Sequence, residues 1–243
     1  MTLAARLVTT CLLLLAAAGC DVTVEPAPDS QGRSSAPTCR TTLENCFTYD
    51  QMDQFLERAT SLVAEFFDTA YDRVPRPQVA YVADGATGRS PCTDPQGTPA
   101  AFTDQSYEYC PANRTIYIGQ NALWAMYDQI GDAAPVVGLA HEWGHHVQTM
   151  TGVPAPRTQA ESVNFENQAD CVAGGWTKHV SDKGVLEYPD DLRDIGGLLE
   201  VIGSREGPAR DHGSTRERTQ SFLIGFRNGL PGCNRFSPAA PII

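Results

Sequence analysis

The chain has 243 residues and a formal net charge of −11 at pH 7. This length is enough for one domain with a hydrophobic core after a leader and a linker are set aside. The acidic balance argues against the basic surface that nucleic-acid binding requires, and it favours solubility without specifying a substrate. We expect a monomer that does not bind nucleic acid.

The first nineteen residues have the pattern of a signal peptide. Arg6 precedes an apolar run over residues 7–18, which is too short to span a membrane as a helix. Ala17-Ala18-Gly19-Cys20 resembles a bacterial lipobox, whose cysteine becomes the lipidated N-terminus. We expect residues 1–19 to be removed, Cys20 to anchor an extracytoplasmic lipoprotein to the bacterial cell membrane, and residues 20–38 to form a flexible tether. The alternative is cleavage after Ala18 and secretion.

Six further cysteines lie in residues 39–243, the expected domain, and an even number outside the cytoplasm is typical of disulfide bonds. Cys11 is removed with the signal peptide, so Cys20 is the odd cysteine, and lipidation gives it a use. Several pairings are open, and our hypothesis is sequential pairing: Cys39 with Cys46, Cys92 with Cys110, and Cys171 with Cys233. The middle pair would close a loop rich in Pro, Gly and Thr and contribute about 3 kcal/mol through loop entropy.

The N-terminal half of the domain is predicted to contain helices and short strands. Thr48 opens a capping box, and the apolar residues after it recur at helical spacing. Gln78–Ala83 and Thr115–Gly119 are rich in β-forming residues and are predicted strands. Residues 84–114 between them are predicted to form a long loop, of a length that often carries function. A helix is predicted from Asn121 to Ile130.

The most specific motif lies in the next helix, which is predicted from Asp132, the N-cap, to near Gly152. His141-Glu142-Trp143-Gly144-His145 places two histidines four residues apart, so both imidazoles lie on the same helical face. Two such histidines can bind one Zn²⁺ ion, and the glutamate beside the first one is then the general base of a zinc protease.

A second pair follows on a helix predicted from Gln159 to Val180. Glu166 and Asp170 are again four residues apart and share a face. A catalytic zinc ion needs a third protein ligand and an outer carboxylate that orients a ligating imidazole, and we assign these roles to Glu166 and Asp170. Glu161 is the alternative third ligand. Cys171 is turned about 100° from Asp170 and is expected in a disulfide or in the core.

Three features complete the C-terminal part. Gly174-Gly175 puts two helix-weakening residues just after the ligand pair. A helix with a structural role is predicted from Asp190 to Ile202. Ser214 and Glu217 form a capping box for a last helix that stops at Gly229.

These motifs resemble a known family. His-Glu-Trp-Gly-His-His-Val-Gln from His141 and Glu-Asn-Gln-Ala-Asp-Cys-Val-Ala-Gly from Glu166 are similar to the bacterial neutral zinc metallopeptidases, within the gluzincin group that includes thermolysin. Tyr109–Ile118 and Asp211–Ser214 match as well, so the resemblance covers roughly residues 78–229. It implies an α+β, zincin-like metalloprotease domain, mostly helical with a small β-sheet. It also implies one Zn²⁺ per chain with Glu166 as the third ligand.

The chain has five histidines, and three of them lie outside the metal motif. His146 is assigned to packing or a hydrogen bond, and His179 to a structural or exposed position. His212 belongs to the His-Gly-Ser segment that resembles the family. Gluzincins commonly place a downstream His, Tyr or Arg beside the oxyanion, so the resemblance implies this role for His212, with loop anchoring as the alternative.

The expected function is that of a zinc-dependent endopeptidase of the bacterial cell envelope, with Glu142 as the general base toward a metal-activated water. The peptide or protein substrate is expected to lie extended and to add a strand beside Thr115–Gly119. Two alternatives from other classes remain open. One is a catalytically silent zincin-fold lipoprotein that acts in binding or assembly, and the other is a zinc amidase that acts on cell-wall material.

Overall fold

A computed structural model describes residues 43, 45–93, 98–203 and 212–243, all of which lie in one unit, Arg33–Ile243. The predictions for residues 1–38, with the signal peptide, Cys20 and the tether, fall outside the described residues, as does Cys39. Within the described ranges, every helix is too short or too polar to span a lipid bilayer.

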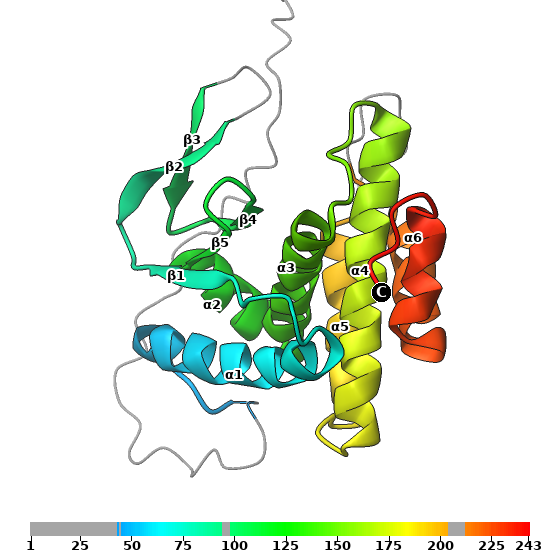
Figure 1. Cartoon of the computed structure of the whole chain (residues 1–243). Coiled ribbons are helices and arrows are strands. Elements are labelled where there is room, and N and C mark those ends of the chain that lie inside the picture. The colour runs from blue at the N-terminus through cyan, green and yellow to red at the C-terminus, as the bar shows by residue number, and fades with distance from the viewer. Residues whose placement is uncertain (1–42, 44, 94–97, 204–211) are drawn as a thin grey trace, which may run out of the picture. The chain divides into compact units, whose positions relative to one another are not determined.

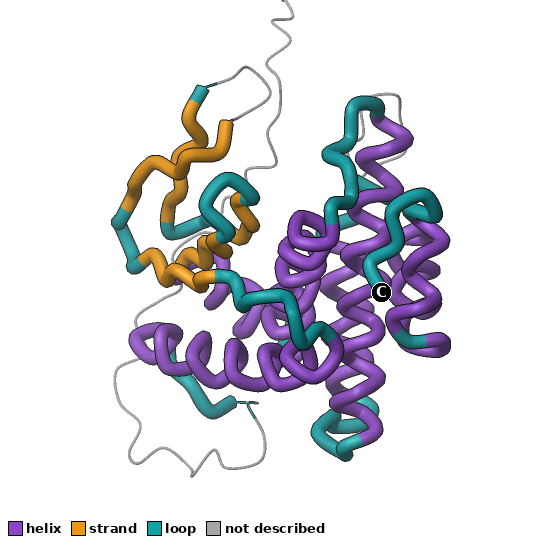
Figure 2. Tube along the Cα trace, in the orientation of Figure 1, coloured by secondary structure: helices purple, strands orange, loops and turns teal. Residues whose placement is uncertain are grey.

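The architecture is α+β and mostly helical, as Figures 1 and 2 show. The helices are α1 (Met52–Ala70), α2 (Gln120–Gln129), α3 (Ala133–Thr151), α4 (Gln159–Asp182), α5 (Asp190–Val201) and α6 (Thr215–Asn228), with 3₁₀ turns η1 (Tyr49–Gln51) and η2 (Leu230–Phe236). The strands are β1 (Gln78–Val82), β2 (Thr87–Thr93), β3 (Pro99–Thr103), β4 (Tyr107–Cys110) and β5 (Thr115–Gly119). The helices predicted from capping and periodicity are therefore confirmed, and the Thr48 capping box opens η1 directly before α1.

Helix α3 lies in the middle of the helical part (Figure 1). It packs against α1 and α2 as well as α4 and α5, and α4 in turn packs along α6. The core that these helices share is rich in aromatic and aliphatic side chains, including Phe55, Phe67, Trp143, Trp176 and Leu198. Because α3 is covered by neighbours on several sides, polar side chains on it are buried as well as apolar ones.

Two glycines allow α4 and α6 to approach closely. A Cβ atom on Gly174 would lie 2.0 Å from the carbonyl oxygen of Phe222, and one on Gly225 would lie 1.7 Å from the carbonyl oxygen of Cys171. Gly174 and Gly175 do not end the ligand helix, because α4 continues through both residues to Asp182, in agreement with the helix predicted from Gln159 to Val180. Tertiary packing against α6 outweighs their low helix propensity.

The strands form two small sheets. In the three-stranded sheet the order is β1-β5-β4, with β1 parallel and β4 antiparallel to β5. Strands β2 and β3 form a separate antiparallel pair. The prediction of a loop over residues 84–114 is wrong, because this segment contains β2, β3 and β4. Its strands are short and largely exposed, so they lack the buried alternation that identifies a strand in a sequence.

The central position of β5 also corrects the expected substrate position. All five residues of β5 are buried, and its two sides are occupied by β1 and β4. A peptide cannot add a strand beside Thr115–Gly119. The edges of this sheet are β1 and β4, and β4 contacts α3.

Two of the three predicted disulfides are confirmed. Cys92 is bonded to Cys110 and joins β2 to β4, and Cys171 is bonded to Cys233 and joins α4 to η2. The predicted pairing of Cys39 with Cys46 involves a residue outside the described ranges. Disulfides of this kind are typical of extracytoplasmic proteins.

Candidate metal centre

Helix α3 carries the first two histidines of the centre. It begins after Asp132 and ends at Gly152, whose φ of 81° is the left-handed conformation that favours glycine at a helix C-terminus. The imidazole rings of His141 and His145 lie with their centroids 4.7 Å apart. The local spacing of the motif therefore places both rings on one face, as predicted.

The carboxylate of Glu166 on α4 faces both rings. His141 Nε2 lies 3.3 Å from Glu166 Oε2, and His145 Nε2 lies 3.3 Å from Glu166 Oε1. One potential ligand atom from each residue falls within 4.8 Å of the other two. Two imidazoles and one carboxylate are a ligand set of catalytic zinc sites, so the residues present fit a Zn²⁺ ion.

Glu161, the alternative third ligand, is not part of this group. Its carboxylate accepts hydrogen bonds from the backbone N–H groups of Arg157 and Thr158, at 2.8 and 2.9 Å. It completes the capping box that starts α4 and is exposed to solvent. Its role is therefore to begin the helix that carries Glu166.

Asp170 holds the ring of His141 from the outer side. Its Oδ1 atom lies 2.8 Å from His141 Nδ1, so the other ring nitrogen, Nε2, faces Glu166. Arg218 on α6 donates to the same Asp170 oxygen at 2.9 Å, and its Nη1 atom lies 3.9 Å from Glu166 Oε2. The side chain of Arg218 is only 3% exposed. A buried guanidinium beside two carboxylates offsets part of their charge, and no local sequence signal had indicated this residue.

Gln148 holds the ring of His145. Its Oε1 atom lies 2.8 Å from His145 Nδ1, so both histidines turn Nε2 toward Glu166. Sequence reasoning did not assign a role to Gln148. A signal was present, because Gln148 follows His145 by three residues, a spacing that puts two side chains side by side on a helix.

The charges at this centre favour a bound cation. Burial disfavours the charged form of His141, but Asp170 and Glu166 outweigh it and raise the pKa of His141 to about 10. Burial acts to raise the pKa of Glu166, but the histidines around it outweigh this effect and hold that pKa well below its usual value. Positive charge is thus stabilised between the two carboxylates, where a divalent cation would supply it.

Glu142 is a residue of α3 whose side chain is directed toward β4, and it is 9% exposed. Burial raises its pKa above the usual value, His145 and His141 act in the opposite direction, and Glu166 raises it further. The backbone of Tyr109 on β4 also forms a hydrogen bond with its carboxylate. The predicted base therefore lies beside the two histidines, and its pKa is raised above that of an ordinary glutamate.

His212 reaches the same centre from the segment before α6. Its Nδ1 atom lies 2.9 Å from Glu166 Oε2, and its side chain is 45% exposed. The other two histidines do not join the group. His146 is fully buried, with Nε2 2.6 Å from the carbonyl oxygen of Pro75, and the ring of His179 packs 5.1 Å from that of Phe66. Both positions agree with the structural roles predicted for them.

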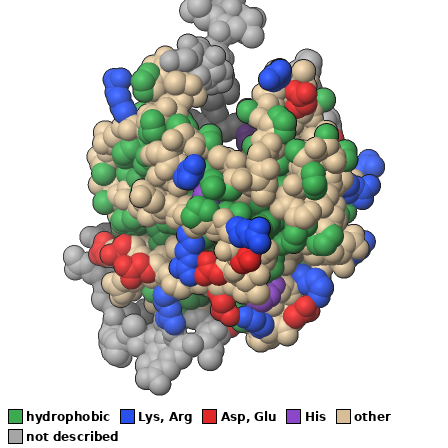
Figure 3. All heavy atoms as spheres, in the orientation of Figure 1, with side chains coloured by type: hydrophobic (Ala, Val, Ile, Leu, Met, Phe, Trp, Pro, Cys, Tyr) green, Lys and Arg blue, Asp and Glu red, His purple; other side chains and the backbone are tan. Residues whose placement is uncertain are grey.

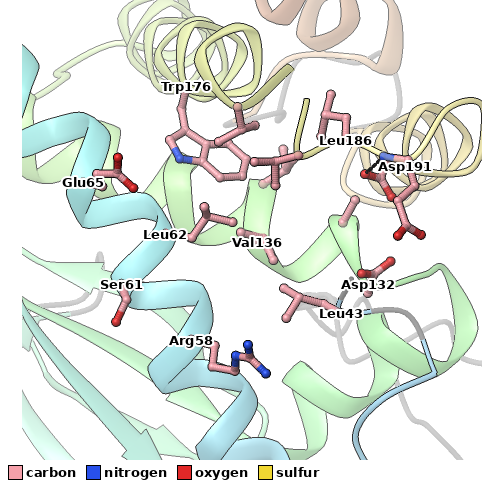
Figure 4. Close-up of a pocket in the computed structure, with 15 residues that line it drawn as sticks. Leu43, Arg58, Ser61, Leu62, Glu65, Asp132, Val136, Trp176, Leu186 and Asp191 are labelled. Atoms are coloured by element: carbon pink, nitrogen blue, oxygen red, sulfur yellow. Dashed lines mark hydrogen bonds between the residues drawn. The ribbon is translucent and has the colours of Figure 1, made fainter. Parts of the chain in front are cut away.

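A cavity of about 300 Å³ lies apart from this centre, between α1, the first half of α3, the C-terminal part of α4 and the start of α5. Figure 4 shows Trp176, Leu62 and Val136 around it, with Asp132 and Asp191 toward one side. Burial, followed by Asp191 and Asp194, raises the pKa of Asp132 to about 7. The group of His141, His145 and Glu166 does not line the cavity, so the cavity is a separate feature.

The outer surface carries charges of both signs. On the face shown in Figure 3, Lys and Arg side chains lie beside Asp and Glu side chains, mainly over its lower half. Surface ion pairs of the described residues include Lys178 with Asp182 and Arg193 with Asp190. Exposed pairs of this kind add little stability, so the packed helices and not the surface charges hold the metal centre in place.

Comparison with known proteins gives the family. A family model matches residues 11–236. The "uncharacterized protein YpfJ" of Escherichia coli K12 is 37% identical over 153 residues, which are 53% of this chain and 53% of that protein. The "uncharacterized protein Rv2575" of Mycobacterium tuberculosis H37Rv is 29% identical over 161 residues, 54% of this chain and 55% of that protein.

The chain spans about half the length of the curated relatives it matches. No solved structure matches it. The family match, in contrast, covers most of the chain and includes every residue of the centre described above. The protein therefore belongs to the family described as "Putative neutral zinc metallopeptidase".

Proposed function

We propose that this protein is a zinc-dependent endopeptidase of the bacterial cell envelope. The observation that carries the proposal is the convergence of His141, His145 and Glu166, whose potential ligand atoms lie within 4.8 Å of one another, with Glu142 buried beside them. Zn²⁺, when bound, lowers the pKa of a water molecule and polarises the scissile carbonyl group.

The side chains around the ligands have distinct tasks. Glu142 accepts a proton from the attacking water and delivers it to the leaving nitrogen, and its raised pKa suits this exchange near neutral pH. Asp170 orients His141, and Arg218 supports the charge of Asp170. With Nδ1–H directed at Glu166, the protonated form of His212 also carries a proton on Nε2, which would donate to the oxyanion of the tetrahedral intermediate.

The substrate is an extended peptide placed along β4. This strand is an edge of the three-stranded sheet, it contacts α3, and the backbone of its residue Tyr109 reaches Glu142. A peptide that paired with this edge would pass in front of the catalytic base. The proposed location is the outer face of the cell membrane, through lipidation of Cys20, and the two disulfides support an extracytoplasmic site.

The test is digestion of a mixed peptide library by the purified, oxidised chain and by its Glu142→Gln variant. The variant keeps the size of the side chain and leaves the three ligands in place, so it should bind one zinc ion per chain as the parent does. Loss of the general base should reduce cleavage by about 10²- to 10⁴-fold. The zinc content of both proteins is measured in the same samples.

The outcomes separate the candidate functions. Cleavage by the parent and its loss in Glu142→Gln support the endopeptidase. Zinc binding without cleavage of any peptide by the parent contradicts it. Hydrolysis of amide bonds in cell-wall material would then identify a zinc amidase, and inactivity on both substrates would identify a silent lipoprotein.

A further inference from the structure

The two histidines of the metal centre are held by chemically different partners. His141 is held by the carboxylate of Asp170, whereas His145 is held by the neutral side chain of Gln148. We propose that Gln148 and Gln168 form a hydrogen-bonded chain that sets the tautomer of His145 from the backbone carbonyl group of Cys233. The inference rests on the proposed role of His145 as a metal ligand.

The contacts of this chain are continuous. His145 Nδ1 lies 2.8 Å from Gln148 Oε1. Gln148 Nε2 donates to the carbonyl oxygen of Phe165 at 2.8 Å and to Gln168 Oε1 at 3.0 Å. Gln168 Nε2 donates to the carbonyl oxygen of Cys233 at 3.1 Å. Both glutamine side chains are fully buried, so solvent does not compete for their hydrogen bonds.

The direction of every hydrogen bond follows from the backbone carbonyl groups at the end of the chain. The carbonyl oxygen of Cys233 can only accept, so Gln168 must turn its NH₂ group toward it and its Oε1 atom toward Gln148. Gln148 must then donate to Gln168 Oε1, and the carbonyl oxygen of Phe165 takes its second N–H. Only Oε1 of Gln148 remains for His145.

An oxygen that can only accept requires a proton on the atom opposite it. His145 Nδ1 must therefore carry the proton, and in the neutral ring this leaves the lone pair on Nε2, the atom that faces Glu166. A flip of either glutamine would put two acceptors or two donors against each other in a buried position, at a cost of about 1–3 kcal/mol for each unsatisfied group. The chain thus selects the tautomer that can bind a metal ion through Nε2.

A neutral chain has an advantage at this place. Glu142, Glu166 and Asp170 already supply three carboxylates around the two histidines. An aspartate or glutamate behind His145 would add a fourth buried negative charge, which is costly without a partner. Gln148 orients the ring as Asp170 does for His141 but adds no charge.

The Cys233 end of the hydrogen-bonded chain is anchored covalently. Cys233 is bonded through its sulfur to Cys171, and Cys171 follows Asp170 on α4, the helix that carries Glu166. The carbonyl group that directs the glutamines is therefore tied to the same helix as the third ligand. Gln148 and Gln168 are positioning residues, since both side chains are fully buried and act through His145.

The experiment compares the zinc affinity of single variants of the purified protein by competition with a chelator. Gln148→Leu and Gln168→Leu remove the polar groups of the hydrogen-bonded chain while keeping most of the side-chain volume. Gln120→Leu is the matched control. Gln120 is also buried, accepts from the Asp84 N–H at 3.0 Å and donates to the carbonyl oxygen of Tyr49 at 3.0 Å, but it lies outside the centre.

Loss of an outer partner of a ligating histidine typically weakens metal binding by about 10- to 100-fold, and we expect this for Gln148→Leu. Gln168→Leu acts one link further away and leaves the Phe165 contact of Gln148 intact, so a loss of roughly threefold to tenfold is expected. The control should stay within about twofold of the parent, although all three variants lose comparable thermal stability.

A second measurement reads the tautomer directly. In the metal-free protein at alkaline pH, the ¹⁵N shifts of His145 should show the proton on Nδ1 in the parent and in Gln120→Leu, and a mixture of tautomers in Gln148→Leu. Equal zinc affinity in Gln148→Leu and Gln120→Leu, or an unchanged tautomer in Gln148→Leu, overturns the inference. If the parent binds zinc and follows this pattern but cleaves no peptide, the endopeptidase proposal fails alone. If the parent binds no zinc, both fail.

Discussion

Replacing Gly225 by alanine should destabilise the protein, although the same change in most helices is favourable. The added Cβ atom would lie 1.7 Å from the carbonyl oxygen of Cys171 and 2.8 Å from the nitrogen of Gly175. Ordinary contact begins at 3.4 Å, so α6 would have to move away from α4. Both opposing atoms belong to the backbone, which cannot yield by changing a rotamer.

The magnitude follows from two opposing effects. Alanine gains about 1 kcal/mol over glycine in helix propensity. Overpacking of a tight core contact costs about 1–3 kcal/mol, and more where the backbone must move. Because the expected contact is about half the normal distance, we expect a net loss of about 2–4 kcal/mol in the free energy of unfolding. Zinc affinity should fall as well, since α6 carries Arg218, which donates to Asp170.

The assay is urea unfolding of the parent, Gly225→Ala and a matched variant, Gly196→Ala. Gly196 lies on the exposed side of α5, and a Cβ atom there would meet nothing within 4 Å. Its replacement should raise the free energy of unfolding by about 0.5–1 kcal/mol. If both alanine variants are more stable than the parent, the close approach of α4 and α6 is refuted.

Two further predictions concern a buried carboxylate and the proposed oxyanion partner. Because burial, Asp191 and Asp194 raise the folded-state pKa of Asp132 from 3.8 to about 7, its contribution to stability is full below the unfolded pKa and is lost as the pH rises to about 7. This contribution amounts to at most about 4 kcal/mol. The free energy of unfolding, measured in urea, should therefore fall less steeply between about pH 4 and pH 7 in Asp132→Asn than in the parent. A fall as steep as that of the exposed control Asp128→Asn would contradict this. His212→Ala should lower kcat by about 10²-fold. His179→Ala should leave kcat unchanged, and equal rates for both histidine variants would favour loop anchoring.

The residues of the metal centre that could be predicted are those whose relation is local. His141 and His145, and likewise Glu166 and Asp170, are four residues apart on their own helices, so one helical face contains each pair. The need of a catalytic zinc ion for a third ligand and an outer carboxylate then joined the two pairs, and the family resemblance agreed with this assignment. Arg218 could not be found in this way, because its contact with Asp170 spans 48 residues and exists only through the packing of α6 on α4.

The β-sheet shows the same limit. The two strands with continuous apolar residues, β1 and β5, were predicted, and they are the parallel pair. Strands β2 to β4 were missed because their residues are mostly exposed or half-buried, and their pairing is stabilised by neighbours and by the Cys92–Cys110 bond. The order of the sheet depends on these missed strands, so the substrate was expected beside β5, which is the central strand of the sheet and not an edge.

The glycines of α4 and α6 connect these points. By local propensity, Gly174 is a defect in the helix that carries two residues of the centre. In the structure it is one of the positions that let α6 come close enough for Arg218 to reach Asp170, and the same packing brings η2 and the Cys233 carbonyl group against α4. The feature that a local rule interprets as weakness thus brings up the groups behind the outer partners of both histidines: Arg218 beside Asp170, and the Cys233 carbonyl group beside Gln168.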